Sequence, residues 1–326
     1  MERLKPITQE QLDAVCAFNK TLMTTFLSDS TELSPTTRKS YESSLRVWFT
    51  WIKDYCGNKP HIEIKPLDYK RFQNWIMARG CSSSDSNGKR AAISSLNSFI
   101  ETYFLDDYPL FRSFITRNIK RPPTVFVNEK KPLTKAEFNN LVEILKKRGE
   151  WQKAAYVLFT FDTACRRAES RNLLKNVVDA KPIVKEKDGR VIKIYQTHPI
   201  RCKGRGEAGK VRRLMFGETT MEALKWWLSV RGQDDCPYMF ITKRGGVKRA
   251  SRTVFNHWAA NDFTEIVGRR FYPHLLRISK ATVLSQEDGL DSKKIQKHLG
   301  HDNLATTEGY IVRDDSDDLD ELFFVP

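Results

Sequence analysis

Long apolar runs and paired cysteines are both missing from this chain of 326 residues. No run of about 18 apolar residues occurs, so no segment is suited to cross a membrane as a helix. The six cysteines are scattered without a C-x-x-C pair, which argues against a zinc finger or a disulfide framework and for reduced thiols. The N-terminal residues also lack the apolar core of a signal peptide. We therefore expect a cytoplasmic protein that has no membrane partner.

Basic residues outnumber acidic ones in all but the last part of the chain. The formal net charge is +15, and six acids but no base lie from Asp314 to the end, so the residues before Asp314 carry +21. A body this basic favours a polyanionic partner, of which nucleic acid is the commonest. The hydrophobic content of 40% excludes a disordered chain, and the length allows two domains with cores of their own.

The first third of the chain has only helical patterns. Apolar residues at helical spacing predict one helix over 8–27, in an N-terminal extension that covers 1–34. A second helix is expected from Ser34, a capping residue, to Gly57, and two more over 66–80 and 86–105. No strand pattern precedes residue 120. We predict a helical core-DNA-binding domain over 35–116.

A basic segment that contains prolines follows, over residues 117–133. Its two adjacent prolines cannot continue a helix, so we interpret it as an interdomain linker. Its charge can follow a phosphate backbone. The predicted DNA contacts in it are Arg117, Lys120 and Arg121.

The residues over 134–312 predict a second, mixed domain. Thr134 and Glu137 form a capping box that opens a helix. Period-2 alternation predicts a strand over 190–198, a second strand is expected over 211–216, and a third strand followed by a turn is expected over 236–246. The basic, glycine-rich segment between the first two strands is typical of a hairpin tip, where we place two more DNA contacts, Arg201 and Arg205. The predicted fold class is mainly α with a small antiparallel sheet (α+β).

Three short motifs combine cations with a tyrosine, which suits attack on a phosphodiester. Extra negative charge on the phosphate oxygens needs preorganised donors, which arginine supplies, and the ester needs a nucleophile and a proton donor. The motifs are T-A-C-R-R-A-E with a later leucine (163–173), H-L-L-R (274–277), and L-G-H followed by T-T and Y (299–310). In this order they resemble the conserved boxes of the tyrosine recombinases, the family of phage integrases and of Xer and Cre recombinases.

The resemblance implies a DNA breaking-rejoining catalytic domain and a role for each matching residue. Tyr310 would be the nucleophile that forms a 3′-phosphotyrosyl link, and Arg166 and Arg277 would hold the scissile phosphate. His274 and His301 would bind the phosphate or activate the tyrosine. Glu169 would orient Arg166, and a hairpin lysine, Lys203, would protonate the leaving 5′-oxygen. The covalent link to the tyrosine would conserve the energy of the ester bond. The reaction would then need neither metal nor ATP, so no cofactor is expected.

Several assignments keep an alternative. Arg167 competes with Arg166, but only Arg166 stands three residues before Glu169. Lys210 competes with Lys203 because both lie in the hairpin segment. His298 and His301 have a spacing that can bind zinc, but no third ligand is evident, and we predict no metal site. The motif also departs from the family, which usually has glycine where this chain has Ala164.

The last residues, 313–326, are acidic and then apolar. We predict that Leu322, Phe323 and Phe324 dock on a neighbouring protomer, because an exposed apolar cluster usually binds a groove. The resemblance implies a monomer that assembles as a tetramer on double-stranded DNA and recombines specific sites through a Holliday junction, in a prokaryotic, phage or plasmid context. A type IB topoisomerase, a telomere-resolving enzyme and a catalytically idle DNA-binding protein are the alternatives.

Overall fold

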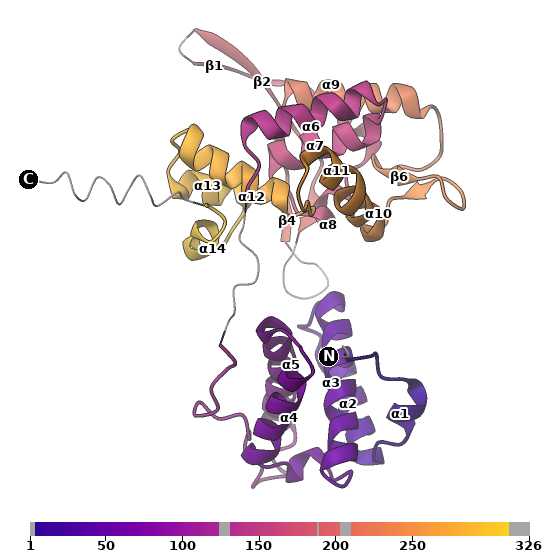
Figure 1. Ribbon diagram of the computed structural model, residues 1–326, viewed down its shortest axis with the longest axis vertical. Helices are drawn as coiled ribbons and strands as arrows, with labels where there is room; N and C mark the ends of the chain where they lie inside the picture. Colours follow the sequence, from indigo (N-terminus) through magenta and orange to yellow (C-terminus); the bar gives the residue numbers. More distant parts are fainter. Residues whose placement is uncertain (1–3, 124–130, 188, 203–209, 313–326) are drawn as a thin grey trace, which may run out of the picture. The chain divides into compact units, whose positions relative to one another are not determined.

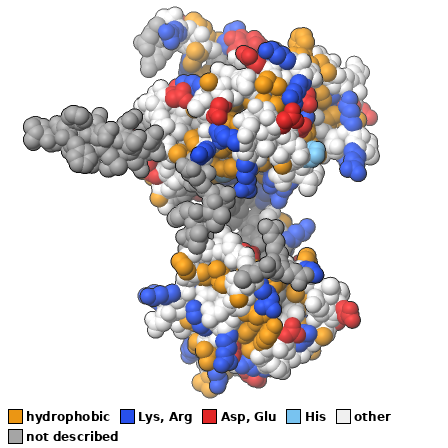
Figure 2. Space-filling model, in the orientation of Figure 1, with side chains coloured by type: hydrophobic (Ala, Val, Ile, Leu, Met, Phe, Trp, Pro, Cys, Tyr) orange, Lys and Arg blue, Asp and Glu red, His pale blue; other side chains and the backbone are white. Residues whose placement is uncertain are grey.

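The structure is a computed structural model that describes residues 4–123, 131–187, 189–202 and 210–312. The chain divides into two compact units, with the division at residues 128 and 129 (Figure 1). Among the described residues, no helix is long and apolar enough to cross a membrane. Figure 2 shows Lys and Arg side chains spread over the visible face of each unit.

The first unit is helical, as the sequence predicts. Its helices are α1 (Gln9–Asp13), α2 (Ala17–Asp29), α3 (Pro35–Tyr55), the short 3-10 helix η1 (His61–Glu63), α4 (Pro66–Ala78) and α5 (Ser83–Tyr103). Ser34 caps α3 by accepting a hydrogen bond from the backbone N–H of Thr37, and Pro35 begins the helix. The core is aromatic and centres on Trp48, which is fully buried and lies 4.8 Å from Phe72 between ring centroids.

The prediction of one helix over 8–27 is wrong, since α1 and α2 are separate helices. The backbone between them is bound by a distant side chain. Asn58 accepts a hydrogen bond from the Cys16 N–H at 2.9 Å and donates one to the Ala14 carbonyl at 3.1 Å. A tertiary contact thus replaces helical hydrogen bonds that the local pattern favours. Both helices contribute side chains to the same apolar cluster as α3, α4 and α5.

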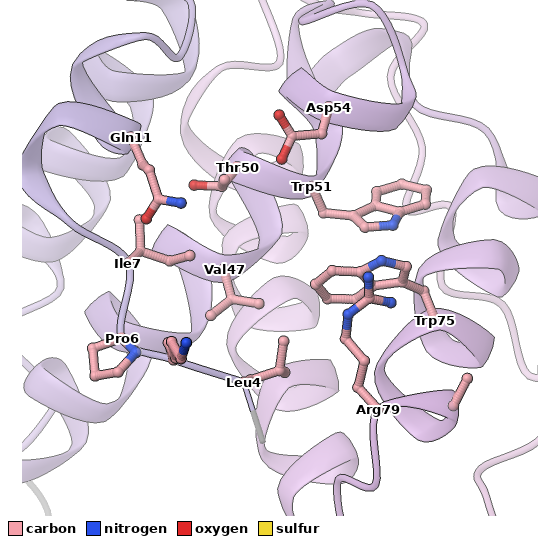
Figure 3. Close-up of a pocket in the computed structure, with 12 residues that line it drawn as sticks. Leu4, Pro6, Ile7, Gln11, Val47, Thr50, Trp51, Asp54, Trp75 and Arg79 are labelled. Atoms are coloured by element: carbon pink, nitrogen blue, oxygen red, sulfur yellow. The ribbon is translucent and has the colours of Figure 1, made fainter. Parts of the chain in front are cut away.

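A groove of about 480 Å³ opens on the first unit (Figure 3). The N-terminal residues Leu4 and Ile7 lie on one side of it, and the side chains of Trp51 and Trp75 lie on the other. Arg79 covers the Trp75 ring, with its Cζ 4.1 Å from the ring centroid. The groove therefore combines apolar and aromatic walls with one stacked guanidinium.

The second unit places helices around a central helix, α7 (Trp151–Thr163), most of which is buried. Packed against α7 are α6 (Lys135–Lys147), α9 (Glu218–Arg231) and α12 (Leu275–Thr282). The predicted capping box of Thr134 and Glu137 is present at the start of α6. The remaining helical segments are α8 (Arg167–Ser170), η2 (Lys175–Asp179), α10 (Arg252–Trp258), η3 (Ala259–Phe263), α11 (Thr264–Val267), η4 (Val283–Glu287), α13 (Ser292–Leu299) and α14 (Leu304–Glu308).

The strands that the structure describes in the second unit form three small antiparallel sheets. One has the order β1 (Ile183–Lys187), β2 (Arg190–Gln196) and β5 (Met215–Gly217), with Tyr195 opposite Phe216. The others pair β3 (Ile200–Cys202) with β4 (Lys210–Arg212) and β6 (Ile241–Thr242) with β7 (Lys248–Arg249). The fold is mainly helical with small antiparallel sheets, which confirms the predicted class.

The strand predicted over 211–216 is two strands, because Thr197 interrupts it. The Thr197 backbone N–H donates to the Leu214 carbonyl at 2.9 Å, and the Leu214 N–H donates to the Thr197 hydroxyl at 3.0 Å. Arg212 therefore belongs to β4, which pairs with β3, and Phe216 belongs to β5. Strands β1, β3 and β7 were not predicted, since none of them has a clear alternation of its own.

Buried His61 makes the stability of the first unit depend on pH. Trp48 Nε1 donates to His61 Nδ1 at 3.0 Å, so Nε2 carries the proton and donates to Asn97 at 2.7 Å. Burial lowers the pKa of His61 to about 4. Below pH ~6.5, His61 is protonated in the unfolded chain but stays neutral in the folded chain. The free energy of unfolding therefore falls as the pH falls towards 4.

We predict that urea unfolding of the full chain shows a loss of about 2 kcal/mol from this histidine between pH 7.5 and pH 5. The measurement is the difference in unfolding free energy between the two pH values, compared with the same difference for His61→Gln. The comparison removes the contribution of the other histidines. Equal pH dependence in the two proteins would contradict the prediction.

Candidate active site

Arg277 in the first turn of α12 is fully buried, yet its hydrogen bonds within the described structure go to neutral acceptors. Its Nη1 donates to the carbonyl of Ala164, and its Nη2 donates to the carbonyl of Leu299 at 2.8 Å and to His301 Nε2 at 2.7 Å. Burial, followed by the nearby charge of Arg166, lowers the pKa of Arg277 to about 10. The guanidinium stays charged at neutral pH, and an uncompensated buried cation favours an anion.

The carbonyl of Ala164 reaches Arg277 because the chain turns sharply at the end of α7. Ala164 has φ 48° and ψ 30°, the left-handed conformation that usually requires glycine. A side chain there costs about 1–2 kcal/mol of backbone strain. This explains physically why glycine is usual at this position in the family that the sequence resembles.

Arg166 and Glu169 form the pair that the sequence spacing indicates. The backbone N–H of Arg166 donates to Glu169 Oε2 at 2.9 Å, and its Nη1 donates to Oε1 at 3.1 Å. The Glu169 carboxylate is almost fully buried, whereas 27% of the Arg166 side chain is exposed. Arg166 can therefore meet a ligand from solvent while its other side is held by the acid. The competing Arg167 turns away and contacts the side chain of Asn256.

His301 is held as a neutral imidazole of one tautomer. A guanidinium can only donate, so His301 Nε2 accepts from Arg277, and Nδ1 must carry the proton that bonds to the Thr307 hydroxyl at 3.0 Å. Burial, then the charges of Arg277 and Arg166, lowers the pKa of His301 to about 4. Its ring nitrogens are both engaged, which leaves neither of them for the zinc site that the spacing allowed.

The Tyr310 hydroxyl lies among these cations and rings, just after α14. It is 2.6 Å from His274 Nε2, and the Tyr310 ring centroid lies 4.8 Å from that of His301. The Arg277 guanidinium carbon is 5.5 Å from the Tyr310 ring centroid. Three segments that are distant in sequence thus bring Arg166, His274, Arg277, His301 and Tyr310 together.

The structure describes only some of the other predicted site residues. Lys203 and Arg205, together with the tail residues Leu322, Phe323 and Phe324, lie outside the described residues. Lys210, the alternative to Lys203, forms an exposed ion pair with Asp302. Arg201 is exposed on β3. Three residues, Arg117, Lys120 and Arg121, are exposed on the segment that follows α5 in the first unit.

Sequence reasoning missed a cluster of arginines around Arg171, which consists of Arg167, Arg171, Arg249 and Arg252. Burial, then repulsion by the other three, lowers the pKa of Arg171. Neutral oxygens hold the cluster, since Arg171 Nε donates to the Ala250 carbonyl at 2.8 Å and Arg249 Nη1 donates to Asn172 at 3.1 Å. No motif marks these residues, and only their clustering in space distinguishes them from ordinary surface cations.

Comparison with known proteins places the chain in a family. Residues 131–317 match the sequence profile of the phage integrase family. The SPbeta prophage-derived recombinase-like protein YomM of Bacillus subtilis is 30% identical over 327 residues, which cover 98% of this chain and 95% of that protein. The tyrosine recombinase XerA of Thermococcus onnurineus is 28% identical over 271 residues, which cover 82% of this chain and 84% of the relative.

Solved structures share the fold. The XerH site-specific recombinase bound to its palindromic difH substrate, a post-cleavage complex, has a TM-score of 0.67 at 18% identity and covers 99% of both chains. The Tn1549 transposon integrase in complex with transposon right end DNA also has a TM-score of 0.67, at 16% identity, over 93% of this chain and 98% of that one.

These likenesses define a tyrosine-type enzyme of DNA cleavage and strand transfer, with a helical N-terminal domain before an integrase catalytic domain. The chain belongs to the phage integrase family and has the two-domain architecture of the Xer recombinases. The family resemblance, the DNA-binding character and the enzyme class that the motifs predict are therefore confirmed.

We predict that Thr307→Val lowers the free energy of unfolding by about 1–3 kcal/mol, because it leaves the buried Nδ1–H of His301 without an acceptor. The matched control is Thr306→Val, the same change at the adjacent, exposed residue. Urea unfolding of the two variants provides the measurement. Equal, small effects would show that the His301–Thr307 hydrogen bond contributes nothing to stability.

Proposed function

We propose that the protein is a site-specific DNA recombinase that cleaves and rejoins DNA through a phosphotyrosine at Tyr310. The observation that supports this most directly is the fully buried Arg277, which forms no ion pair among the described residues and whose guanidinium carbon lies 5.5 Å from the Tyr310 ring centroid. A phosphodiester supplies the missing negative charge. Arg277 and Arg166 would hold its non-bridging oxygens and stabilise the added charge of the transition state.

The proposed reaction moves one proton at each end of the transferred bond. The Tyr310 oxygen attacks phosphorus while its proton passes to His274 Nε2, which lies at hydrogen-bond distance. The bond to the 5′-oxygen breaks, and Lys203 is assigned as the donor that protonates this oxygen. The product is a 3′-phosphotyrosyl link and a free 5′-hydroxyl. Attack by a 5′-hydroxyl of a second strand reverses the step, so the bond energy is conserved without ATP or a metal.

Recombination through a Holliday junction in a tetramer is the finer part of the proposal. It is supported by the kinship with the prophage recombinase-like protein and with Xer recombinases, and by solved relatives bound to DNA recombination sites. A lambda integrase fragment of the same fold is a dimer bound to a core site, with a TM-score of 0.59. We place the protein in a prokaryotic cytoplasm, with a mobile element as its context. Docking of Leu322, Phe323 and Phe324 on a neighbouring protomer stays part of this proposal.

The arginine cluster around Arg171 extends the proposed DNA interface. Other arginines of the second unit pair with acids: Arg148 Nη2 is 2.8 Å from Glu265, and Arg231 Nη2 is paired with Asp234. Within the described structure, Arg171 and Arg252 have no such acid and repel each other. We assign them to backbone phosphates that flank the scissile one, together with the sequence-predicted Arg117, Lys120, Arg121, Arg201 and Arg205.

We predict that a nicked suicide substrate, incubated with the protein in EDTA, gives a covalent protein–DNA complex that Tyr310→Phe abolishes while DNA binding is retained. The reason is that phenylalanine keeps the ring but removes the nucleophilic oxygen. Denaturing gel electrophoresis detects the complex. The matched control is Tyr272→Phe, which removes a hydroxyl from a half-buried tyrosine of the same unit and leaves the yield unchanged.

A covalent complex that survives Tyr310→Phe would refute the nucleophile assignment. A substrate with two sites then separates recombination from simple relaxation of supercoils. Recombination gives exchanged products and a four-way junction intermediate, whereas relaxation alone would overturn the finer proposal. The same substrate detects a catalytically idle protein, which would bind both sites without any cleavage.

We predict that Arg171→Gln with Arg252→Gln, in a Tyr310→Phe background, lowers the slope of log Kd against log salt by about 2, since each lost phosphate contact removes about 1. Fluorescence anisotropy with a random-sequence duplex measures this slope. Arg148→Gln is the matched control, because its guanidinium is already paired. An unchanged slope in the double variant would remove these arginines from the interface.

A further inference from the structure

Arg212 links the β3–β4 hairpin to two of the three motifs of the site. It is the last residue of β4 and lies opposite Ile200 of β3. Its Nη2 donates to Glu169 Oε2 at 3.1 Å, and its Nη1 donates to the backbone carbonyl of His298 at 3.2 Å. These partners lie 43 residues before it and 86 residues after it in the chain. One side chain thus bridges the segment of Arg166 and the segment of His301.

Glu169 needs a second cation in addition to Arg166. Its carboxylate is 1% exposed, and each oxygen faces a different guanidinium: Oε1 that of Arg166 and Oε2 that of Arg212, each at 3.1 Å. Burial raises the pKa of Glu169, but the charges of Arg212 and Arg166 outweigh burial and hold it below its usual value. Without Arg212, a buried carboxylate would have one cation only and would draw Arg166 towards itself.

The second contact of Arg212 lies at the turn that presents His301. Gly300 ends α13 with φ +66°, and a Cβ added to it would lie 2.4 Å from Arg212 Nη1 and 3.0 Å from its Cζ. The guanidinium therefore packs directly on the backbone of this turn. The same turn supplies the Leu299 carbonyl and the His301 imidazole to Arg277.

We propose that Arg212 is a positioning residue that holds Arg166, through Glu169, and Arg277, through the Leu299–His301 turn, in register around one phosphate. Arg212 already donates to one protein oxygen from each of its Nη atoms, so we assign it to holding the protein and not to binding that phosphate. Its effect is on the stabilisation of charge on the phosphate and not on the proton given to the leaving oxygen. The proposal rests on the proposed function, in which Arg166 and Arg277 bind the scissile phosphate.

The test is single-turnover cleavage of the nicked suicide substrate by Arg212→Met, Arg212→Lys, Glu169→Gln and the double variant Glu169→Gln/Arg212→Met. We expect Arg212→Met to lower the cleavage rate by about 100-fold, a usual consequence of a small misplacement of catalytic groups. Lysine keeps the charge beside Glu169 but cannot bond to both partners, so its rate should be intermediate. The double variant should be slowed by less than the product of the two single effects, because Arg212 and Glu169 share one route, through Arg166.

A second substrate, with sulfur in place of the bridging 5′-oxygen, separates positioning of the phosphate ligands from proton donation. Its thiolate leaving group needs no general acid, because a thiol has a pKa near 8.5. We expect the defect of Arg212→Met to persist on this substrate and that of Lys203→Ala to disappear. Thermal unfolding and binding to the uncleaved duplex serve as controls, and both should change little in Arg212→Lys.

Three results would overturn the proposal: a wild-type rate in Arg212→Met, full rescue of that variant by the sulfur substrate, or independent, multiplicative effects of the two single changes. If Arg212→Met does not fold, the cleavage rate of Arg212→Lys is measured on both substrates instead. A wild-type rate in that variant would also overturn the proposal. Failure of the proposed function looks different, because the wild-type protein itself would then form no covalent complex.

Discussion

The buried charge of Arg277 is the constraint around which the catalytic unit is organised. Moving a guanidinium out of water costs several kcal/mol, which must be offset by hydrogen bonds of good geometry. Two backbone carbonyls and one imidazole supply them, from the end of α7, the end of α13 and the turn after it. Both helices end at a left-handed residue, Ala164 or Gly300, which turns a carbonyl towards the cation. The neutral state and the tautomer of His301 follow from the same contact.

The arginines of this unit fall into two groups, according to whether they form a salt bridge with an acid. Arg148, Arg212, Arg231 and Arg269 each face a carboxylate, and these pairs connect segments of the protein. Arg277, Arg171 and Arg252 have only neutral partners or none in the described structure, which leaves their charge for an external anion. Arg166 belongs to both groups, because one side meets Glu169 and the other is exposed. Counting bases in the sequence does not reveal this division, since it depends on which acids lie within about 4 Å.

Local signals in the sequence predicted local structure well. The caps at Ser34 and Thr134 act within three residues, so the sequence contains both partners of each contact. The predictions of one helix over 8–27 and one strand over 211–216 were wrong because of long-range contacts. Asn58 separates α1 from α2, and Thr197 separates β4 from β5. The site shows the same limit. Glu169 and Arg166 stand three residues apart and were predicted as a pair, whereas Arg212, the other partner of Glu169, stands 43 residues away and was missed.

The hydrogen bonds of Arg277 also bear on the order in which the chain folds. Its guanidinium binds Ala164, 113 residues earlier, and Leu299, 22 residues later. The strands and α9 to α11 lie between Ala164 and Arg277 in the sequence. Contacts across such separations require a large loss of chain entropy before they contribute stability. The arrangement of side chains around Arg277 therefore exists only once the whole unit has closed. A partly folded chain already contains every residue of the site, but it has no geometry with which to cut DNA.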